Sequence, residues 1–511
     1  MLDALPPPPV AHHPNNSMWI DEQIWGHRLW DSTSPWLIFL EFLGVAEARD
    51  REGHLLDDQG RPYPLAFKPA RRMYARNLLY NNESLGRIAG EGLADAAAWN
   101  KWLPLMAKSA QGIPKSEFAY LRDRFSSFRD FATLIDMLRS STIENGTNKR
   151  WSSRFVFPFG RHALYEDLNV KTGSAAREYI NFGLPGELVY QMLCRSKSAA
   201  ELRPLLAAAF DGDPCDKLMS LLEPPYEEDR ETRGNSYLPY ATHPSFDRLA
   251  EDWLELFRRE LPRFDAYPHL ARLGALHLLK YQMDVAAEIA GDSQPFLVCE
   301  IVAPRRTPVR ELSISSFQRN DSLPQRAVEA YVHAIGSSPA WIAALDGDSP
   351  FHDCRAAMVE QARWPDEDDY IGPQEPAELL ASLRKAAVAR HRQHVANVHR
   401  SYGAGAGLVS RRGTTQLRYA PSDSLLKTLI LANVPVRMNY AEFLELLFER
   451  YGLVIGDREA AQVLPSEDFD RKSFQTNSNR LQRRLRTLGM LRRLSDACAY
   501  VENPIAGSGM R

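Results

Sequence analysis

The chain has 511 residues, of which 44% are hydrophobic and 25% are charged, and its formal net charge is −3. This composition is typical of globular proteins and excludes collagen-like and disordered classes, while the length allows about three domains. No apolar run reaches the roughly 18 residues that a membrane-spanning helix requires. Prolines 6–9 occupy the place where a secretory signal would need an apolar core. We therefore expect a cytoplasmic protein without a membrane partner, whose five scattered cysteines are reduced thiols.

Charge is divided unevenly along the chain. Residues 376–511 contain 21 Lys and Arg against 12 Asp and Glu, whereas residues 1–375 contain 41 against 53. A basic end on an acidic body favours contact with a polyanion such as nucleic acid through that end. The alternative is a basic face that is simply exposed to solvent.

Residues 1–16 are rich in proline and polar side chains, and we expect them to form a disordered lead. The segment that follows contains Trp19, Trp25, Trp30 and Trp36 among apolar residues. Because aromatic side chains have large apolar areas to bury, we interpret this cluster as core or interface. A platform for stacking bases is the alternative, and the acidic residues nearby disfavour it.

Residues 17–222 are predicted to form a first, mainly helical domain. Apolar residues recur from Phe118 to Met137 at the spacing of one face of an amphipathic helix. Residues 184–194 are also predicted to be helical. The sequence RFVFP at 154–158 is the one extended segment that we expect in this half of the chain.

Residues 223–235 combine prolines with charges of both signs and predict a linker. A second domain is expected over residues 236–400, with helices at 246–261, 270–290 and 377–400 and a strand at 294–302. The sequence GAGAG at 403–407 predicts a flexible hinge after the last of these helices. The expected fold class is therefore mainly α with minor β, in a multidomain helical protein.

Residues 420–511 have the order of elements of a winged-helix domain, and we expect the multidomain chain to end in one. Hydroxyl and carboxylate side chains at 422–424 can cap a first helix that runs to Asn433. A short strand is predicted to follow at 434–437.

Asn439 then predicts the cap of a second helix, with Glu442 placed to complete a capping box and Gly452 placed as the C-cap. A third helix is expected from about Lys472 to Leu488. The sequences MLRRLS and CAYV, which come next, predict a hairpin wing.

The third helix separates apolar from basic residues. Its buried side is expected to consist of Phe474, Ser478, Leu481, Leu485 and Leu488. The opposite side and the wing carry residue types that contact the major groove and phosphates in helix-turn-helix proteins. The predicted DNA-binding residues are Lys472, Thr476, Asn479, Arg480, Arg483, Arg484, Arg486, Arg492 and Arg493. Winged helices can also dock onto proteins, which is the alternative interpretation.

We find no motif in the sequence for catalysis, a metal or a cofactor. No GxxxxGK[ST] phosphate loop occurs, and GAGAG lacks the spacing of a dinucleotide fingerprint. Glu300 on the predicted strand is the best candidate for metal-dependent nuclease chemistry, but the lysine usual two residues later is a valine. A buried pair with Arg305 or Arg306 explains Glu300 equally well. His277 lies on an apolar helix and is expected to be a core histidine.

Three segments resemble poorly characterised accessory proteins of bacterial anti-phage islands, of the kind associated with DNA-methylation-based defence. They are DEQIWGHRLWDSTSPWLIFLEFL, FGLPGELVYQMLCRS and RLQRRLRTLGMLRRLSDACAYVENP. The resemblance spans most of the chain and implies a partner-dependent role in sensing or restricting foreign DNA.

We therefore expect a DNA-binding accessory or sensor subunit of an anti-phage defence system, which binds duplex DNA through its C-terminal winged helix. Other protein subunits of the same system are the expected partners. The alternatives are an interaction scaffold of a defence complex and, third, a divergent metal-dependent nuclease. The sequence favours a role without catalysis, and it indicates neither the oligomeric state nor a preferred DNA sequence.

Overall fold

The computed structural model describes residue 5 and residues 20–505, except 27–28, 32, 58–64, 71, 81, 111–116, 141–159, 165–167, 172–173, 178–183, 227–229, 231, 363–373, 413–414 and 496–497. Over this part of the chain the protein is mainly helical, with short strands in small sheets, so the expected balance of helix and strand is confirmed. The predicted disordered lead, except for residue 5, lies outside the described residues. Trp19 and the predicted strand at 154–158 also lie outside them.

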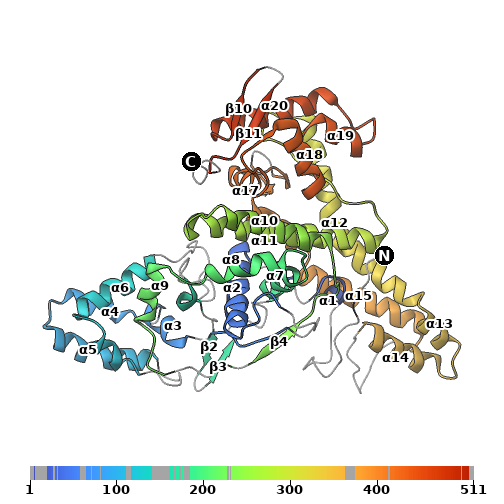
Figure 1. Cartoon of the computed structure of the whole chain (residues 1–511). Helices are drawn as coiled ribbons and strands as arrows, with labels where there is room; N and C mark the ends of the chain where they lie inside the picture. Colours follow the sequence, from blue (N-terminus) through green and yellow to red (C-terminus); the bar gives the residue numbers. More distant parts are fainter. Residues whose placement is uncertain are drawn as a thin grey trace.

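The N-terminal half contains two groups of helices. In the first, α2 (Pro35–Arg51) packs along α7 (Leu184–Cys194), and both contribute to the main hydrophobic core. The second group has a separate core around Trp99 and Trp102 and lies at one end of the molecule, at the lower left of Figure 1. It consists of α3 (Met73–Tyr80), α4 (Ser84–Gly90), α5 (Asp95–Ser109), the 3-10 helix η2 (Ala119–Asp123) and α6 (Phe128–Ser140).

The prediction of one helix from Phe118 to Met137 is wrong, because the chain turns between η2 and α6. Ser127 starts a new helix there: its Oγ accepts a hydrogen bond from the Asp130 backbone N at 3.1 Å. Serine favours such caps because its hydroxyl competes for backbone groups. Met137 is 39% exposed, so the apolar face that suggested a continuous helix does not extend to it.

Shorter elements join these groups. The strand β1 (Leu65–Phe67) pairs antiparallel with β4 (Arg233–Ser236), so the predicted linker at 223–235 contributes part of a strand. The remaining elements of this half are α1 (Ile20–Trp25), η4 (Arg161–Ala163), β2 (Leu168–Lys171), β3 (Ser174–Arg177), α8 (Ala199–Ala208) and α9 (Pro214–Ser220).

Tryptophans of the N-terminal cluster belong to the core. Trp25 and Trp30 are buried, and the indole Nε1 of Trp25 donates a hydrogen bond to the Gln282 carbonyl at 3.0 Å. A buried indole needs such a partner for its single N–H group. The interpretation of this cluster as core is confirmed for Trp25 and Trp30.

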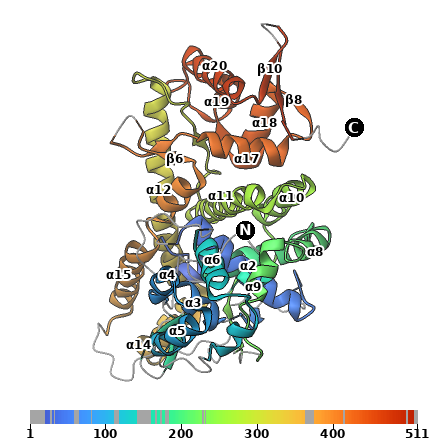
Figure 2. The same cartoon turned by 90° about the vertical axis from the view of Figure 1, so that its left-hand side faces the viewer.

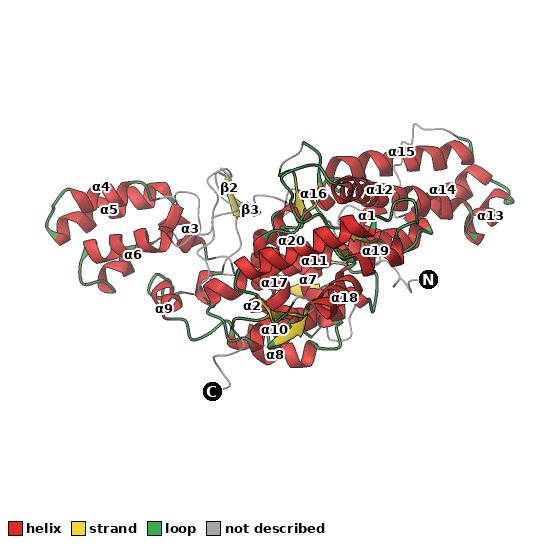
Figure 3. Ribbon diagram, turned by 90° about the horizontal axis from the view of Figure 1, so that it is seen from above, coloured by secondary structure: helices red, strands yellow, loops and turns green. Residues whose placement is uncertain are grey.

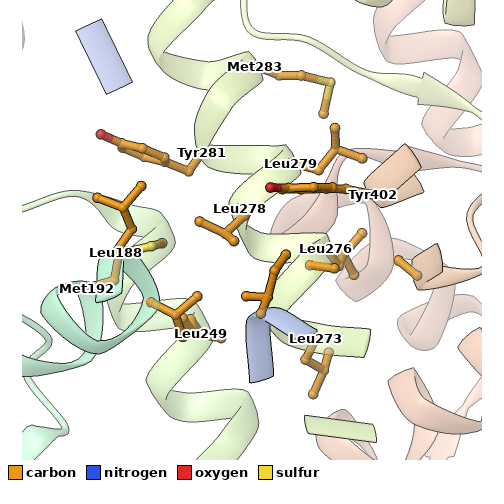
Figure 4. Packing of buried hydrophobic residues seen from close by; sticks show 14 of the residues in the cluster. Leu188, Met192, Leu249, Leu273, Leu276, Leu278, Leu279, Tyr281, Met283 and Tyr402 are labelled. Atoms are coloured by element: carbon orange, nitrogen blue, oxygen red, sulfur yellow. The ribbon is translucent and has the colours of Figure 1, made fainter. Parts of the chain in front are cut away.

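The centre of the molecule is the long helix α11 (Arg263–Ala290), preceded by α10 (Pro244–Arg258). α11 is buried along most of its length because its sequence is apolar on nearly every side. Figure 4 shows its leucines packed among Leu188 of α7, Leu249 of α10 and Tyr402 of α16 (Val398–Ala406). The helices predicted at 246–261 and 270–290 are thus confirmed.

A second long helix, α12 (Pro308–Gly336), leads away from this centre. It is followed by α13 (Pro339–Leu345), α14 (Pro350–Ala362) and α15 (Pro376–His394). Figure 3 shows α13 and α14 at the end of the molecule opposite α4 and α5. The helix predicted at 377–400 is divided between α15 and α16, with a break at 395–397.

The prediction that GAGAG forms a flexible hinge is wrong, because four of its five residues lie in α16 and are closely packed. A Cβ atom on Gly405 would lie 2.5 Å from the ring of Pro35, and one on Gly403 would lie 2.5 Å from Val409. Glycine is needed here for close approach of the helix to its neighbours. Gly407 ends the helix with a φ of 82°.

The strand predicted at 294–302 is present only as β5 (Leu297–Val298), which pairs in parallel with β9 (Leu453–Val454). This pairing joins the middle of the chain to its C-terminal part. A further hairpin joins β6 (Val409–Ser410) to β7 (Arg418–Tyr419). The main core accordingly contains residues from Ile20 to Val501, and the predicted domain boundaries stay predictions.

The C-terminal elements lie above α10 and α11 in Figures 1 and 2. They are α17 (Asp423–Asn433), β8 (Arg437–Asn439), α18 (Tyr440–Tyr451), β9, α19 (Asp457–Val463), α20 (Arg471–Thr487), β10 (Leu491–Arg493) and β11 (Ala499–Glu502). β11 lies between β10 and β8, and both pairings are antiparallel. None of the helices in the described part of the chain combines the length and apolar character that a membrane crossing needs.

Candidate nucleic-acid interface

Local capping interactions fix the helices that support the basic C-terminal region. The Ser422 Oγ accepts a hydrogen bond from the Leu425 backbone N at 3.1 Å, and the Asn439 Oδ1 accepts one from the Ala441 backbone N at 2.9 Å. Gly452 ends α18 with a φ of 73°, a conformation that costs glycine little. These caps confirm the first two predicted helices of this region.

The capping box expected at Glu442 is not formed. The equivalent interaction lies in α19, where the Glu459 Oε2 accepts a hydrogen bond from the Gly456 backbone N at 3.2 Å. Burial raises the pKa of Glu459, so this capping carboxylate becomes protonated at a higher pH than an exposed glutamate would.

Asp470 caps the start of α20, and its carboxylate accepts a hydrogen bond from the Lys472 backbone N at 3.1 Å. Phe474, Leu481 and Leu485 are buried as expected, but Leu488 is 36% exposed. The prediction for Leu488 fails because the helix ends there and Gly489 turns the chain with a φ of 71°. Ser478, which was also predicted on the buried side, is half-buried, and Met490 after the turn is buried.

Asn477 holds α20 against the body of the protein. Its side chain is fully buried; the Oδ1 accepts a hydrogen bond from the Ile301 backbone N at 2.8 Å, and the Nδ2 donates to the carbonyls of Cys299 and Ile455 at 2.9 and 3.0 Å. These backbone groups belong to buried residues, where the loss of a hydrogen bond is costly. Sequence reasoning missed this residue, although a polar side chain on the apolar side of a helix was the available signal.

The opposite face of α20 carries an exposed basic stripe. Lys472, Thr476, Asn479, Arg483 and Arg486 are spaced by three or four residues and are all exposed, so they lie on one side of the helix. The Thr476 hydroxyl donates to the Lys472 carbonyl at 2.8 Å, so part of its hydrogen-bonding capacity is used inside the helix. Arg480 and Arg484, which were predicted to be exposed on the same side, are half-buried, and DNA contact by any of these residues stays a prediction.

Four arginines of this region have no carboxylate partner within the described residues: Arg480, Arg483, Arg486 and Arg492. Arg480 is half-buried and the other three are exposed. Arg493 is also exposed, and its Nε donates to the Ser495 carbonyl at 3.1 Å. The guanidinium groups on α20 and β10 therefore form one surface with little local neutralisation.

Arg484 differs from its neighbours. Its Nε donates to the Asp423 carboxylate and its Nη1 donates to the Pro421 carbonyl at 2.9 Å, which ties α20 to the start of α17. Only 23% of its side chain is exposed. Arg471 is likewise paired, with its Nε 3.2 Å from the Asp457 Oδ2. The structure thus places Arg484 at the edge of the basic stripe with a structural contact of its own.

Acidic residues lie next to the basic stripe at the beginning of α20. Glu467, Asp468 and Asp470 are exposed just before it. A hydrogen bond from the Ser473 hydroxyl, with others from nearby backbone amides, lowers the pKa of Asp470 and keeps it charged. A polyanion would be repelled at this end, so the C-terminal half of α20 and the adjoining β10 are the favourable part of the surface.

The hairpin beside α20 is supported by the strand before α18. Arg437 of β8 stacks over Tyr500 of β11, with its guanidinium carbon 5.5 Å from the ring centre. The Tyr440 hydroxyl at the start of α18 donates to the Ser478 carbonyl of α20 at 2.9 Å. Sheet and helix are therefore held in one arrangement by contacts from α18 and β8.

A buried polar cluster fixes this region to α10 and α11. Asp252 is fully buried, and its carboxylate lies 2.7 Å from the His277 Nε2, the Arg450 Nη2 and the Tyr451 hydroxyl. Burial alone would raise the pKa of Asp252, but the hydrogen bond from His277 and the charge of Arg450 outweigh it and lower the pKa. His277 is thus a core histidine, as predicted, and its Nε2 is hydrogen bonded to Asp252.

Glu300 belongs to a second buried cluster. Its Oε1 accepts a hydrogen bond from the Arg310 Nε at 3.0 Å and its Oε2 accepts one from the Arg418 Nε at 2.5 Å. The partners suggested from the sequence were wrong: Arg306 pairs instead with Glu311 at 2.6 Å. A carboxylate held between two arginines is not available to a metal, and no group of metal-binding side chains is found among the described residues.

The fold and surface together define a mainly helical protein with a basic helix and hairpin at its C-terminal end. Residues 373–502 match the model of a protein family described as methylation-associated defense system protein MAD7. No curated protein and no solved structure matches the chain. The matched segment includes every element from α15 to β11. The sequence resemblance to methylation-associated defence is therefore confirmed over this part of the chain.

Proposed function

We propose that this protein is a DNA-binding accessory or sensor subunit of a methylation-associated anti-phage defence system, and that other subunits of the system are its partners. We further propose that α17 to β11 form a winged helix in which α20 is the DNA-contacting helix, α19 is an additional short helix before it, and the β10 and β11 hairpin is the wing. The observation that carries the proposal is the surface of Arg480, Arg483, Arg486 and Arg492, which have no carboxylate partner in the described part of the chain.

Counterion release would favour the binding of DNA to this surface. Exposed arginines attract mobile anions, and duplex DNA releases its own condensed cations when such side chains contact its phosphates. Each phosphate contact lowers the slope of log affinity against log salt by about 0.9. Arginine can also pair bidentately with guanine in the major groove, where a helix fits. The rigid attachment of α20 through Asn477 would hold these side chains in one orientation.

The test is a salt titration of duplex DNA binding by the full-length protein, because β5, Asn477 and Asp252 join the C-terminal region to the body. We expect the triple variant Arg483→Ala, Arg486→Ala, Arg492→Ala to bind at least tenfold more weakly and to reduce the salt slope by about 3. All three side chains are exposed, so the variant should fold normally.

A matched control is Arg87→Ala, Arg122→Ala, Arg129→Ala, which makes the same change in net charge on exposed residues of α4, η2 and α6. These elements lie at the far end of the molecule from α20 in Figure 1. We expect the control to keep the wild-type affinity and slope. Equal effects of the two variants, or binding that does not respond to salt, would contradict the proposal and favour docking of this region on a protein.

A further inference from the structure

A cavity of about 770 Å³ lies in the N-terminal half of the protein. Its walls come from the end of α2, the residue after β1, the start of α3, η4, residues 223–226 and Arg230. Cavities of roughly 300–1,000 Å³ are typical of sites for small organic ligands. This one is also strongly basic, because five arginine and lysine side chains line it against two carboxylates.

Three of the lining arginines are held by carboxylates that do not line the cavity. Arg51 is paired with Glu47, and the Arg161 Nη2 lies 2.9 Å from the Asp50 Oδ2. Arg72 is buried, with its Nη2 3.7 Å from the same Glu47. A guanidinium has five N–H donors, so an acid on one side leaves donors for an anion on the other. The arginines are therefore positioned in advance, which reduces the cost of binding.

Two further cations of the cavity, Lys68 and Arg230, have no carboxylate partner among the residues that the structure describes. Arg230 is half-buried, and burial lowers its pKa, with no compensating acid among the described residues. A bound anion would supply the missing compensation.

The two carboxylates of the cavity are already neutralised. Glu223 lies 2.6 Å from the His162 Nδ1 and 3.7 Å from the Arg72 Nε, and Glu52 lies 3.1 Å from the Arg49 Nη1. The hydrogen bond with Glu223 raises the pKa of His162, which favours its charged form. Neither acid therefore cancels the attraction of Lys68 and Arg230 for an anion.

We propose that this cavity binds a phosphorylated small molecule of the size and chemistry of a nucleotide. The arginines and Lys68 would bind the phosphates. Tyr74, Tyr226 and two prolines in the walls offer apolar and aromatic surface to the rest of the molecule. The cavity is larger than inorganic phosphate needs, which is why the proposal specifies an organic phosphate. This site is separate from the α20 surface and does not depend on the proposed DNA binding.

The experiment is calorimetric titration of the full-length protein, at constant ionic strength, with adenine and guanine nucleotides, inorganic phosphate and adenosine. We expect at least one nucleotide to bind at least tenfold more tightly than inorganic phosphate, and adenosine not to bind. Lys68→Glu and Arg230→Glu should each weaken nucleotide binding at least tenfold. Lys68 is exposed and Arg230 is only half-buried, so these variants should fold.

Lys108→Glu and Arg122→Glu are matched controls, because both residues are exposed outside the cavity. They should leave nucleotide binding unchanged. The proposal is overturned if no nucleotide binds at millimolar concentration, if inorganic phosphate or adenosine binds as tightly, or if the controls weaken binding as much as the cavity variants. Binding of a single-stranded oligonucleotide but of no mononucleotide would also overturn it. None of these measurements involves duplex DNA, so they are independent of the salt titration.

Discussion

The buried cluster around Glu300 and the exposed face of α20 use the same residue type for opposite purposes. Arg418 is fully buried and paired with Glu300 at 2.5 Å, whereas Arg483 and Arg486 are exposed and have no carboxylate partner in the described chain. An arginine in a low-dielectric interior must be paired, but one at the surface can exchange its counterions for a polyanion. Burial and pairing, and not the number of arginines, therefore distinguish a scaffold from an interface.

The N-terminal cavity is intermediate between these two regions. Three of its arginines are paired with acids, as in the cluster around Glu300, but they also line a space of about 770 Å³. Fixed cations suit one small ligand with a defined shape, whereas exposed arginines on a helix suit a long polymer with many equivalent phosphates.

The largest change in the free energy of unfolding should follow from removing Glu300 from its buried cluster. Glu300→Ala would leave Arg310 and Arg418 buried without their shared carboxylate, and loss of one partner of a buried pair costs about 3–5 kcal/mol. Denaturant unfolding should show this loss. Arg483→Ala is the surface counterpart and should change the free energy of unfolding by less than about 0.5 kcal/mol. Equal stabilities of the two variants would contradict the proposed difference between the buried and the exposed arginines.

Lowering the pH should cause a smaller loss in the free energy of unfolding. Burial lowers the pKa of His399 to about 4, and burial with nearby cations lowers the pKa of His243 and His269 to about 4. Unfolding restores an ordinary pKa near 6.5, so the unfolded chain binds more protons below that pH. The contribution of these histidines to the free energy of unfolding is therefore complete above pH 6.5, and it is lost progressively as the pH falls toward 4.

The contribution of His399 can be isolated with His399→Gln, which does not titrate in this range and can still reach the Tyr419 hydroxyl, now 2.8 Å from the His399 Nε2. Between pH 7 and pH 5 the wild type should lose about 2 kcal/mol more than the variant, because one pKa unit corresponds to about 1.4 kcal/mol. The measurement is denaturant unfolding at both pH values. An identical loss in the two proteins would show that His399 is not the titrating group.

The smallest effect concerns Arg484, which shares features of both regions. Its pair with Asp423 is at the surface, and Asp423 is 57% exposed, so Arg484→Ala should cost less than about 1 kcal/mol of stability. Because this guanidinium is already occupied, the substitution should change the salt slope of DNA binding less than Arg483→Ala, which we expect to reduce it by about 1. A larger slope change for Arg484→Ala would place it within the interface.

Elements of the C-terminal region could be predicted where the signal was local. Ser422, Asn439 and Gly452 each specify a helix end through contacts with residues a few positions away. The separation of basic and apolar sides of α20 also follows from residue spacing alone. Local reasoning failed at GAGAG, because glycine serves a hinge and a close helix contact equally well, and Pro35 and Val409 decide between them.

Contacts between distant residues could not be predicted. Glu300 meets Arg418 across 118 residues, and Asn477 meets Ile301 across 176. Any of several arginines could have been the partner of Glu300, because an ion pair has no local sequence signature. The cavity presents the same difficulty, since its walls come from segments between residues 48 and 230.

The sequence by itself determined the mainly helical class, the helix caps near the C-terminus and the basic stripe of α20, because propensity, capping and periodicity act within a few residues. Only the tertiary structure decided which arginines are exposed, which are paired, and that Lys68, Arg72 and Arg230 border one cavity. Burial and pairing depend on which distant segments share the core, and that is a property of the whole fold.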